Sequence, residues 1–539
     1  MTDRSDGAAK AFDALVVGAG FAGIQAVHEL RGLGLSVHLV EAGPDVGGVW
    51  NWNRYPGART DIQSYEYCYS FSRELWEAWE WTERYPSQPE VLAYLRFAAD
   101  RLDVRRFMQF DTRVESACWD EGSHRWTIAT DAGDAFAARF LVLATGGLSR
   151  PLPPPFAGLD SFEGEWYLTA RWPQEPVELA GKRVGIVGVG STGVQLVPAV
   201  AEVAERVTVF QRTPNYVIEA GNSALTQEQR DDKRDRYDEI RDLLRSHPGG
   251  ITLPMPTTSI KEHPREVAWA MLEESWQRGG LYVTLTFWDV MADLEANELF
   301  CEFIRSKIRS IVEDPETAEL LCPKGYPFGA KRPPIGHHYY EAFNRDNVEL
   351  VDVRTDPIER ITPSGLRTRE RTFDLDVLVF ATGFDAITGS ILGIDVRGRD
   401  GVSLAEQWSN GPRTYLGCCA NGFPNLFFVA GPQTPFANQP VIIDLTVGWM
   451  IDAVRFVLDR GLEAIEPSEQ AVAQWCADVD EMRDASPLFK EIDDLHTFIV
   501  GTNVEGKPRA TYFFHAPIPM FRERLGSAVH NEFEEFDRV

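Results

Sequence analysis

Long apolar runs are missing from this sequence of 539 residues, and so is a leader-like N-terminus. No stretch reaches the roughly 18 consecutive apolar residues that a membrane-spanning helix needs. Residues 1–11 are small and polar, without the apolar core of a secretory signal. We therefore expect no membrane segment, a short frayed N-terminal tail and a protein of the cytoplasm.

Cysteine is scarce, and basic residues are outnumbered. The 7 cysteines are odd in number and show neither a CxxC pair nor the Cys/His spacing of a metal site. Free thiols in a reducing compartment are the simplest interpretation. The 53 Lys and Arg residues stand against 81 Asp and Glu, a formal net charge of -28. Because nucleic-acid binding relies on clustered basic side chains, this balance argues against a nucleic-acid partner.

What the sequence does contain is typical of a globular protein of two or three domains. It is 44% hydrophobic and 25% charged, close to the average for soluble domains. The chain is long enough to bury cores of ordinary size without disulfides or structural metals.

Residues 14–41 carry the pattern of a strand, a glycine-rich turn, a helix and a second strand. The turn reads Gly18-Ala-Gly20-Phe-Ala-Gly23, and the second strand ends at Glu41. Such glycines permit a tight turn and let backbone N–H groups approach a pyrophosphate at the helix N-terminus. Glu41 can accept hydrogen bonds from a ribose diol, which suits FAD or NAD and repels a 2′-phosphate.

The same pattern recurs at residues 184–211, around the turn Gly188-Val-Gly190-Ser191-Thr192-Gly193. One GxGxxG is weak evidence, but two copies in register are much stronger. At the place of Glu41 the second copy has neutral Gln211, followed by Arg212 and Thr213. A cation and a hydroxyl suit a phosphate, so we expect NADPH here. The alternative is that Arg212 is a solvated surface charge.

Two apolar runs, residues 140–146 and 377–383, both end in Ala-Thr-Gly just before an irregular stretch. We interpret them as chain crossings between domains. Between them, a charged run at 227–245 and an apolar-periodic run at 296–312 indicate helices. The predicted fold is α/β, with two Rossmann-type dinucleotide-binding domains, the NADP domain inserted in a split FAD domain, and a helical subdomain. The expected boundaries are 1–150 and 385–539 for the FAD domain, 151–215 and 324–384 for the NADP domain, and 216–323 for the helical insertion.

Four motifs together resemble the type I Baeyer–Villiger monooxygenases. They are Gly47-Gly-Val-Trp-Asn-Trp-Asn-Arg-Tyr-Pro-Gly-Ala-Arg-Thr-Asp61, residues 162–173, Tyr326-Pro-Phe-Gly-Ala-Lys-Arg332 and Ala381-Thr-Gly-Phe-Asp385. The resemblance runs from about residue 12 to residue 509. It implies an FAD- and NADPH-dependent enzyme that inserts one oxygen atom of O2 next to a ketone carbonyl, giving an ester or lactone through a C4a-peroxyflavin and a Criegee adduct.

The resemblance also implies roles for individual residues. Arg332 would stabilise the flavin peroxide anion and the charge of the adduct, and Asp61 would orient or tune Arg332. A guanidinium is always cationic and offers fixed donors where negative charge develops. Lys331 would share the 2′-phosphate with Arg212 and Thr213. The other implied contacts are Arg59 and Thr60 at the nicotinamide, Trp50 and Tyr67 at the flavin, and Phe436, Asn438, Gln439 and Val441 in a substrate pocket closed by Phe498, on a mobile loop.

Two positions depart from the family pattern. The fingerprint histidine is replaced by Leu168, and a tryptophan of the C-terminal loop is replaced by Phe498, which loses an indole N–H donor. Since the family histidine couples the domains, we expect Leu168 to make the enzyme leakier. For Gln439 two interpretations stay open: contact with a functionalised substrate, or a satisfied structural amide.

Three other functions stay open. An N- or S-oxygenating flavin monooxygenase uses the same two modules, although Trp172-Pro173 favours the Baeyer–Villiger type. A disulfide reductase needs a redox-active cysteine pair, and adjacent Cys418-Cys419 lies in no CxxC motif. A partly uncoupled NADPH oxidase would follow from decay at Leu168 and Phe498. We expect a monomer or a weak homo-oligomer.

Overall fold

Two sheets organise the chain in the computed structural model, which describes residues 9–489 and 495–539. The larger sheet has 8 strands in the order β17-β4-β5-β6-β1-β2-β3, with β18 joined to β6. Its strands are β1 (Lys10–Val17), β2 (Val37–Val40), β3 (Met108–Gln109), β4 (Val114–Asp120), β5 (Arg125–Thr130), β6 (Ala135–Leu143), β17 (Asp395–Arg397) and β18 (Leu426–Phe428). This sheet and α1 (Phe21–Gly32) form what we call the first module.

The second sheet has 5 strands in the order β12-β9-β8-β16-β7, all paired in parallel. The strands are β7 (Glu165–Leu168), β8 (Arg183–Val187), β9 (Arg206–Gln211), β12 (Val348–Asp352) and β16 (Val377–Phe380). With α5 (Ser191–Ala201) they form the second module. All five strands fall between β6 and β17 of the first module. The predicted fold class, one dinucleotide-binding domain inserted in another, is confirmed.

The two chain crossings lie side by side. Leu152 N–H donates to Gly383 O (3.0 Å), and Asp385 N–H donates to Arg150 O (2.9 Å). Pro151 and Phe384 face each other in an antiparallel bridge. The modules are therefore joined by two hydrogen-bonded strands of chain and not by one free linker.

The repeated Ala-Thr-Gly motif has a packing reason. Gly18 has φ +104°, and a Cβ there would lie 2.6 Å from the carbonyl oxygen of Ala144. Gly188 has φ +107°, and a Cβ there would lie 2.6 Å from the oxygen of Ala381. In each module the end of the neighbouring strand is seated directly against the first glycine of the turn, where only glycine fits.

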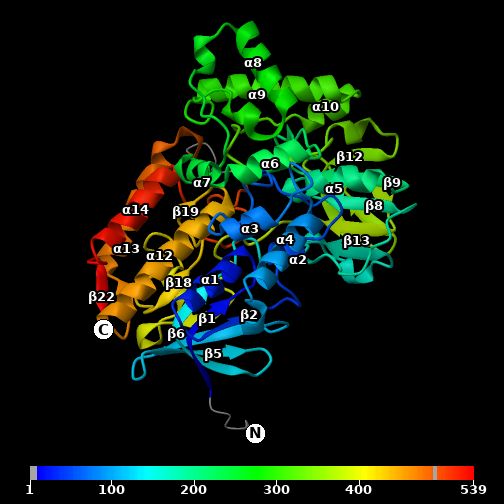
Figure 1. The fold of residues 1–539 in the computed structure, drawn as a ribbon. Coiled ribbons are helices and arrows are strands. Elements are labelled where there is room, and N and C mark those ends of the chain that lie inside the picture. Colours follow the sequence, from blue (N-terminus) through cyan, green and yellow to red (C-terminus); the bar gives the residue numbers. More distant parts are fainter. Residues whose placement is uncertain (1–8, 490–494) are drawn as a thin grey trace.

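Helices cover one end of the molecule, opposite the larger sheet (Figure 1). The helical insertion holds α6 (Gln227–Asp235), α7 (Tyr237–Ser246), α8 (Arg265–Arg278), α9 (Leu294–Ile311) and α10 (Pro315–Leu321). The run at 227–245, predicted as one helical stretch, is broken at Arg236 (φ -94°, ψ 26°). Every residue of α6 reaches the surface, whereas α7 buries Tyr237, Ile240 and Leu244. The break lets α7 turn its apolar face inward.

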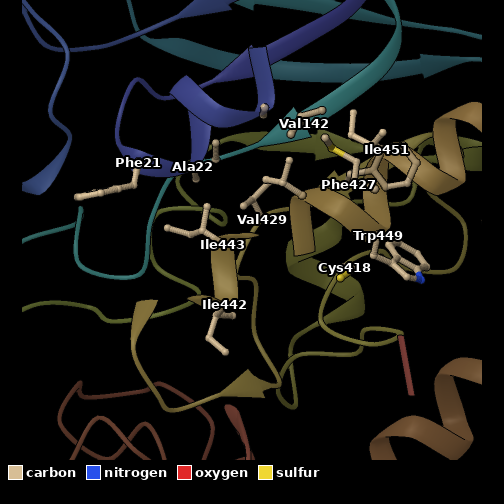
Figure 2. Close-up of a cluster of buried hydrophobic side chains, with 14 of the residues drawn as sticks. Phe21, Ala22, Val142, Cys418, Phe427, Val429, Ile442, Ile443, Trp449 and Ile451 are labelled. Atoms are coloured by element: carbon tan, nitrogen blue, oxygen red, sulfur yellow. The ribbon is translucent and has the colours of Figure 1, made fainter. Parts of the chain in front are cut away.

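The C-terminal part adds α12 (Gln439–Arg460), α13 (Glu469–Ala485) and α14 (Ile518–His530) to the first module. Helix α12 packs against α1. Figure 2 shows the apolar core of this region, with side chains that include Phe21, Ala22, Val142, Phe427, Val429, Ile443 and Trp449. Among residues 9–489 and 495–539, the model has no helix with the length and apolarity to span a membrane.

Candidate active site

The N-terminus of α1 is open to an anion. Gly20 precedes the helix, and within the described chain no side chain caps it and no acidic residue lies in its first turn. A Cβ on Gly23 would lie 1.8 Å from Gly18 O, and one on Gly20 would lie 3.5 Å from Gly48 Cα. The N–H groups of the first turn therefore lack a side-chain acceptor and are available to an anion beside the glycine turn, which fits a pyrophosphate.

Glu41 is buried beside this turn. One carboxylate oxygen accepts from Ala19 N–H (2.6 Å) and the other from Gly43 N–H (2.7 Å). Burial raises the pKa of Glu41, and these two hydrogen bonds oppose that effect. A carboxylate has about four acceptor sites, so lone pairs remain for a ribose diol. Position and chemistry both fit the predicted contact.

Aromatic rings line the side of the turn where a flavin is expected. Trp50, in α2 (Val49–Trp52), stands edge-on to Tyr67 with ring centres 5.7 Å apart. Tyr67 stands edge-on to Phe21, the first residue of α1, at 5.4 Å. The structure thus brings Trp50 and Tyr67 together at the start of α1. Burial raises the pKa of Tyr67 to about 12, so its phenol stays protonated.

The N-terminus of α5 repeats this geometry in the second module. Gly190 precedes the helix, again with no side-chain cap and no acid in the first turn of this described segment. A Cβ on Gly193 would lie 2.1 Å from Gly188 O. At Gly190, by contrast, an added Cβ would have none of the described atoms within 4 Å. Ser191 and Thr192, both half-buried, complete the turn.

Two cations converge near this turn. Burial, followed by repulsion from Arg212, lowers the pKa of Lys331 to about 8. Lys331 Nζ lies 5.7 Å from the centre of the Tyr326 ring. Across residues 9–489 and 495–539, neither Lys331 nor Arg212 pairs with a carboxylate. Two such cations, with half-buried Thr213 beside Arg212, fit a phosphate dianion. The side chain of Gln211 is buried and donates to Leu320 O (2.8 Å).

Arg332 and Asp61 form an ion pair across the two modules, with Nη2 and Oδ2 2.7 Å apart. The Asp61 side chain is 8% exposed and that of Arg332 38% exposed. Burial raises the pKa of Asp61, while Arg332 and a hydrogen bond from Gln195 oppose that rise. Arg332 Nη1 also donates to Ser191 Oγ (3.4 Å) in the first turn of α5. The guanidinium is thus anchored on one side and accessible on the other.

Arg59 and Thr60, predicted at the nicotinamide, are held by their own surroundings. Arg59 Nη1 donates to Glu83 Oε2 (2.8 Å) and to Tyr85 O (3.0 Å). Thr60 is 2% exposed, and its hydroxyl donates to Ile62 O (2.7 Å). Both lie in the loop that carries Asp61. A ligand contact at either position stays a prediction.

Two of the predicted pocket residues come together in an aromatic wall. The ring of Phe436 lies 5.8 Å from that of Phe498 and 4.8 Å from that of Phe513. Phe436 remains 44% exposed, so the wall faces open space. No sequence pattern selected Phe513 as a site residue. It enters through a short parallel pairing of β19 (Thr434–Pro435) with β21 (Phe513–Phe514).

The other pocket candidates divide into a deeper layer and the rim. The Asn438 amide donates to Glu66 O (2.7 Å) and Gly250 O (2.9 Å) and is 3% exposed. Val441 is 2% exposed in the core below it. Gln439 is exposed, and its amide donates only locally, to Ala437 O (3.2 Å). Asn438 therefore shapes the wall as a structural amide, whereas Gln439 keeps hydrogen-bonding capacity.

The segment with the altered fingerprint bridges the modules. Leu168 ends β7 and packs against an apolar cluster that includes Phe210 and Phe380. Arg171 stacks over Trp52 of the first module, 4.4 Å from the ring centre. It also donates to Ser149 O (3.0 Å). The apolar side chain at 168 therefore has apolar neighbours.

Gln195 of α5 is a site residue that the sequence interpretation missed. Its amide contacts Tyr55, Arg59 and Asp61 of the other module. The signal that could have found it is its position in the repeat, because Gln25 stands at the same place after the first glycine of its own turn.

Comparison with known proteins decides the family. A Baeyer–Villiger monooxygenase of Pseudooceanicola batsensis is 41% identical over 530 residues, which span 97% of this chain and 95% of that protein. The chain belongs to the Baeyer–Villiger monooxygenase family. A Pseudomonas putida relative, 2-oxo-Δ3-4,5,5-trimethylcyclopentenylacetyl-CoA monooxygenase, is 42% identical over 98% of each chain. The crystal structure of OTEMO in complex with FAD and NADP superposes with a TM-score of 0.94 at 39% identity, covering 98% of this chain and 100% of that one.

Residues 12–236 of this Baeyer–Villiger monooxygenase also match the family model described as pyridine nucleotide-disulphide oxidoreductase. The match covers the two glycine turns and not a dithiol centre. All seven cysteines are free thiols, and burial raises the pKa of both Cys418 and Cys419. A buried protonated thiol is a poor nucleophile, so the disulfide reductase alternative has no support here.

Proposed function

We propose that this Baeyer–Villiger monooxygenase uses FAD and NADPH to insert one oxygen atom of O2 next to a ketone carbonyl, giving an ester or lactone. The observation that carries the proposal is the ion pair between Arg332 and Asp61, held next to two open dinucleotide turns. The named relatives support the reaction, and the FAD and NADP complex supports the two cofactors.

The first module would hold FAD. Its pyrophosphate would meet the turn of Gly18, Gly20 and Gly23, its ribose Glu41, and its ring system Trp50 and Tyr67. When bound, FAD supplies the redox chemistry that takes hydride from NADPH and activates O2. The protein supplies binding, orientation and charge.

The second module would hold NADPH. The N-terminus of α5 would receive its pyrophosphate at Gly188, Gly190, Ser191, Thr192 and Gly193. The 2′-phosphate would be shared by Arg212, Thr213 and Lys331. Within the described residues, neither of the two cations, Arg212 and Lys331, pairs with a carboxylate. Arg59 and Thr60, in the loop that carries Asp61, would border the nicotinamide.

Arg332 would supply a fixed positive charge where negative charge develops on oxygen during oxygenation. Its guanidinium is cationic at every working pH and has several donors, of which Asp61 occupies only part. Asp61 would hold the guanidinium in place before the reaction begins, so that little reorganisation is needed as charge develops. Removing Arg332 should therefore spare hydride transfer and abolish oxygenation.

The ketone would bind against the rings of Phe436 and Phe498, with Gln439 at the rim and Asn438 and Val441 shaping the wall behind. An apolar wall with few polar groups is typical of a small-molecule site. The size and substitution of the ketone would follow from the space between this wall and Arg332.

The test is product analysis with the FAD-loaded protein, NADPH and a panel of ketones under ¹⁸O-labelled O2. We expect one labelled oxygen atom in an ester or lactone. The panel includes amines and sulfides, because labelled N-oxide or sulfoxide without ester would replace the proposal with N- or S-oxygenation. Consumption of NADPH that yields only hydrogen peroxide for every compound would contradict it.

We further propose that the enzyme works in the reducing cytoplasm as a monomer or a weak homo-oligomer, with the domain boundaries given above. Seven free thiols support the compartment. The side-by-side crossings at residues 150–152 and 383–385 support the boundaries between the modules.

A further inference from the structure

Gln195 has an unusually complete set of partners for a buried amide. It is 6% exposed, and its Oε1 accepts from the Tyr55 hydroxyl (2.9 Å) and from Arg59 N–H (3.4 Å). Its Nε2 donates to Arg59 O (3.1 Å) and to Asp61 Oδ1 (3.3 Å). A side-chain amide has two acceptor lone pairs and two N–H donors, and all four are used. The partners also fix which end of the amide faces Asp61.

Asp61 is thereby held from two sides. Oδ1 receives the hydrogen bond from Gln195 of α5, and Oδ2 pairs with Arg332 at 2.7 Å. A carboxylate bonded at both oxygens cannot rotate freely. The position of Asp61 Oδ2, and with it the position of Arg332, therefore depends on Gln195. The backbone is equally close at this place, because a Cβ on Gly57 would lie 2.3 Å from Gln195 O.

The first module contains the same arrangement at the equivalent position. Gln25 Nε2 donates to Asp444 Oδ1 (3.2 Å), and Asp444 Oδ2 pairs with Arg245 at 2.6 Å. That triad ties α1 to α12 and α7, and its arginine is 23% exposed. None of its three residues belongs to the proposed cofactor or substrate contacts. The chain therefore carries a matched internal control for the second triad.

We propose that Gln195 is a positioning residue for oxygenation, which fixes the orientation and charge of Asp61 and through it places Arg332. The proposal rests on the proposed function, since Arg332 has a catalytic role only if the enzyme oxygenates. Gln195 would act on Arg332 through Asp61, and its contacts with Arg59 are to the backbone N–H and carbonyl only.

The electrostatics around Asp61 make this role measurable. The charged group that faces it is Arg332, and the titratable groups around it are the phenols of Tyr55, Tyr67 and Tyr85. Burial raises the pKa of each of these phenols, so they stay neutral at working pH. The N–H of Gln195 stabilises the charged form of Asp61, and its removal should raise the pKa of that carboxyl. A protonated Asp61 no longer pairs with Arg332.

The experiment compares the FAD-loaded wild type with Gln195→Glu, Gln195→Leu and Gln25→Leu. Gln195→Glu keeps the shape and both acceptor contacts, loses the donors and adds a negative charge beside Asp61. Gln195→Leu loses all four contacts without adding a charge. Two measurements are made: the Asp61 pKa by ¹³C-carboxyl NMR titration, assigned with Asp61→Asn, and labelled ester per NADPH oxidised across pH. We expect both Gln195 variants to raise the Asp61 pKa by about one unit or more. We expect a loss of about 10-fold in ester per NADPH near neutral pH, with the acidic limb of the profile moved to higher pH. Gln25→Leu should leave both quantities unchanged.

Two results would overturn the proposal. One is an unmoved Asp61 pKa and an unmoved ester yield in Gln195→Glu, which would make the amide a packing element only. The other is an equal loss of flavin reduction and of ester formation with an unmoved Asp61 pKa, which would place the defect in the scaffold of α5. If the wild type forms no ester from any ketone, the proposed function fails. The NMR titration still reports separately whether Gln195 controls Asp61.

Discussion

Replacing Arg332 with alanine should separate the two halves of the catalytic cycle. Hydride transfer from NADPH to FAD needs both cofactors bound with their rings stacked. Arg332 belongs to neither of the glycine turns that would bind the cofactor pyrophosphates, so its loss should leave hydride transfer possible. Oxygenation needs a cation where negative charge develops. Loss of one preorganised donor at such a place is worth about 3 to 4 kcal/mol, or roughly 10²- to 10³-fold in rate. We expect flavin reduction at a measurable rate and almost no ester.

The same substitution leaves Asp61 without its cation. Its side chain is 8% exposed, but the lost partner is 38% exposed and its charge is screened by solvent. We therefore expect a loss of only about 1 to 2 kcal/mol in the free energy of unfolding, below the range for a fully buried pair. Asp61 responds by holding its proton, so its pKa in the folded protein rises further above the ordinary 3.8. A carboxyl with a raised folded pKa stabilises at low pH and loses that contribution as pH rises. Arg332→Ala should thus be less destabilised at pH 5 than at pH 8.

Stopped-flow reduction without O2, followed by aeration and product analysis, measures the two halves, and thermal unfolding at pH 5 and pH 8 measures the linkage. Arg245→Ala is the matched control, because it breaks the equivalent pair with Asp444, and neither residue is among the proposed cofactor contacts. That variant should lose stability and keep its ester yield per NADPH. Wild-type ester formation by Arg332→Ala would reduce Arg332 to a surface charge or a cofactor clamp and remove the main support for the proposed function.

Three further predictions concern the second module and the fingerprint. Arg212→Ala should lower the preference for NADPH over NADH, measured as a ratio of kcat/KM values, by about 10-fold or more. In the wild type the same preference should weaken above about pH 8, because Lys331 loses its proton there. An equal kcat/KM ratio in variant and wild type would contradict the phosphate site. Leu168→His should raise the amount of ester formed per NADPH oxidised. It should also lower the melting temperature, because it places a polar ring against an apolar cluster. An unchanged ester-to-NADPH ratio would mean that the surroundings have adapted to leucine. Gly190→Ala should fold normally, because its added Cβ would have no described atom within 4 Å. It should nevertheless raise the Kd for NADP. Wild-type NADP binding by this variant would mean that the pyrophosphate lies elsewhere.

The parts of the fold that repeat were the parts that the sequence could predict. Strand β2 ends at Val40, next to Glu41 where the second strand was expected to end, and both glycine turns open a helix as predicted. These features depend on local periodicity and on the small size of glycine, which are visible within about thirty residues. The break at Arg236 was not predictable in this way, because its cause lies in another element: the Tyr237 hydroxyl donates to Ser70 O (2.7 Å).

In the candidate site, too, residues that belong to local motifs could be predicted, and residues whose roles depend on distant segments could not. Family motifs selected Asp61 and Arg332, and the structure places them 2.7 Å apart although 271 positions separate them in the sequence. The repeat marks Gln195 only as the counterpart of Gln25, and no local pattern selects Phe513. Both residues take their roles from partners on distant segments. For Asn438 the pocket contact implied by the family resemblance stays a prediction, and its amide nitrogen donates to Glu66 O and Gly250 O.

The division of the site between two modules has a physical consequence. Asp61 precedes the first chain crossing, whereas Arg332 and Gln195 lie between the crossings, so the ion pair of Asp61 with Arg332 exists only while the modules are docked. Any rotation of the second module about the paired crossings at 150–152 and 383–385 must break or carry along the contacts of Gln195 and Arg332 with the Asp61 loop. Gln195 and the uncapped N-terminus both belong to α5, so any such rotation would move the proposed NADPH site and the partner of Asp61 together.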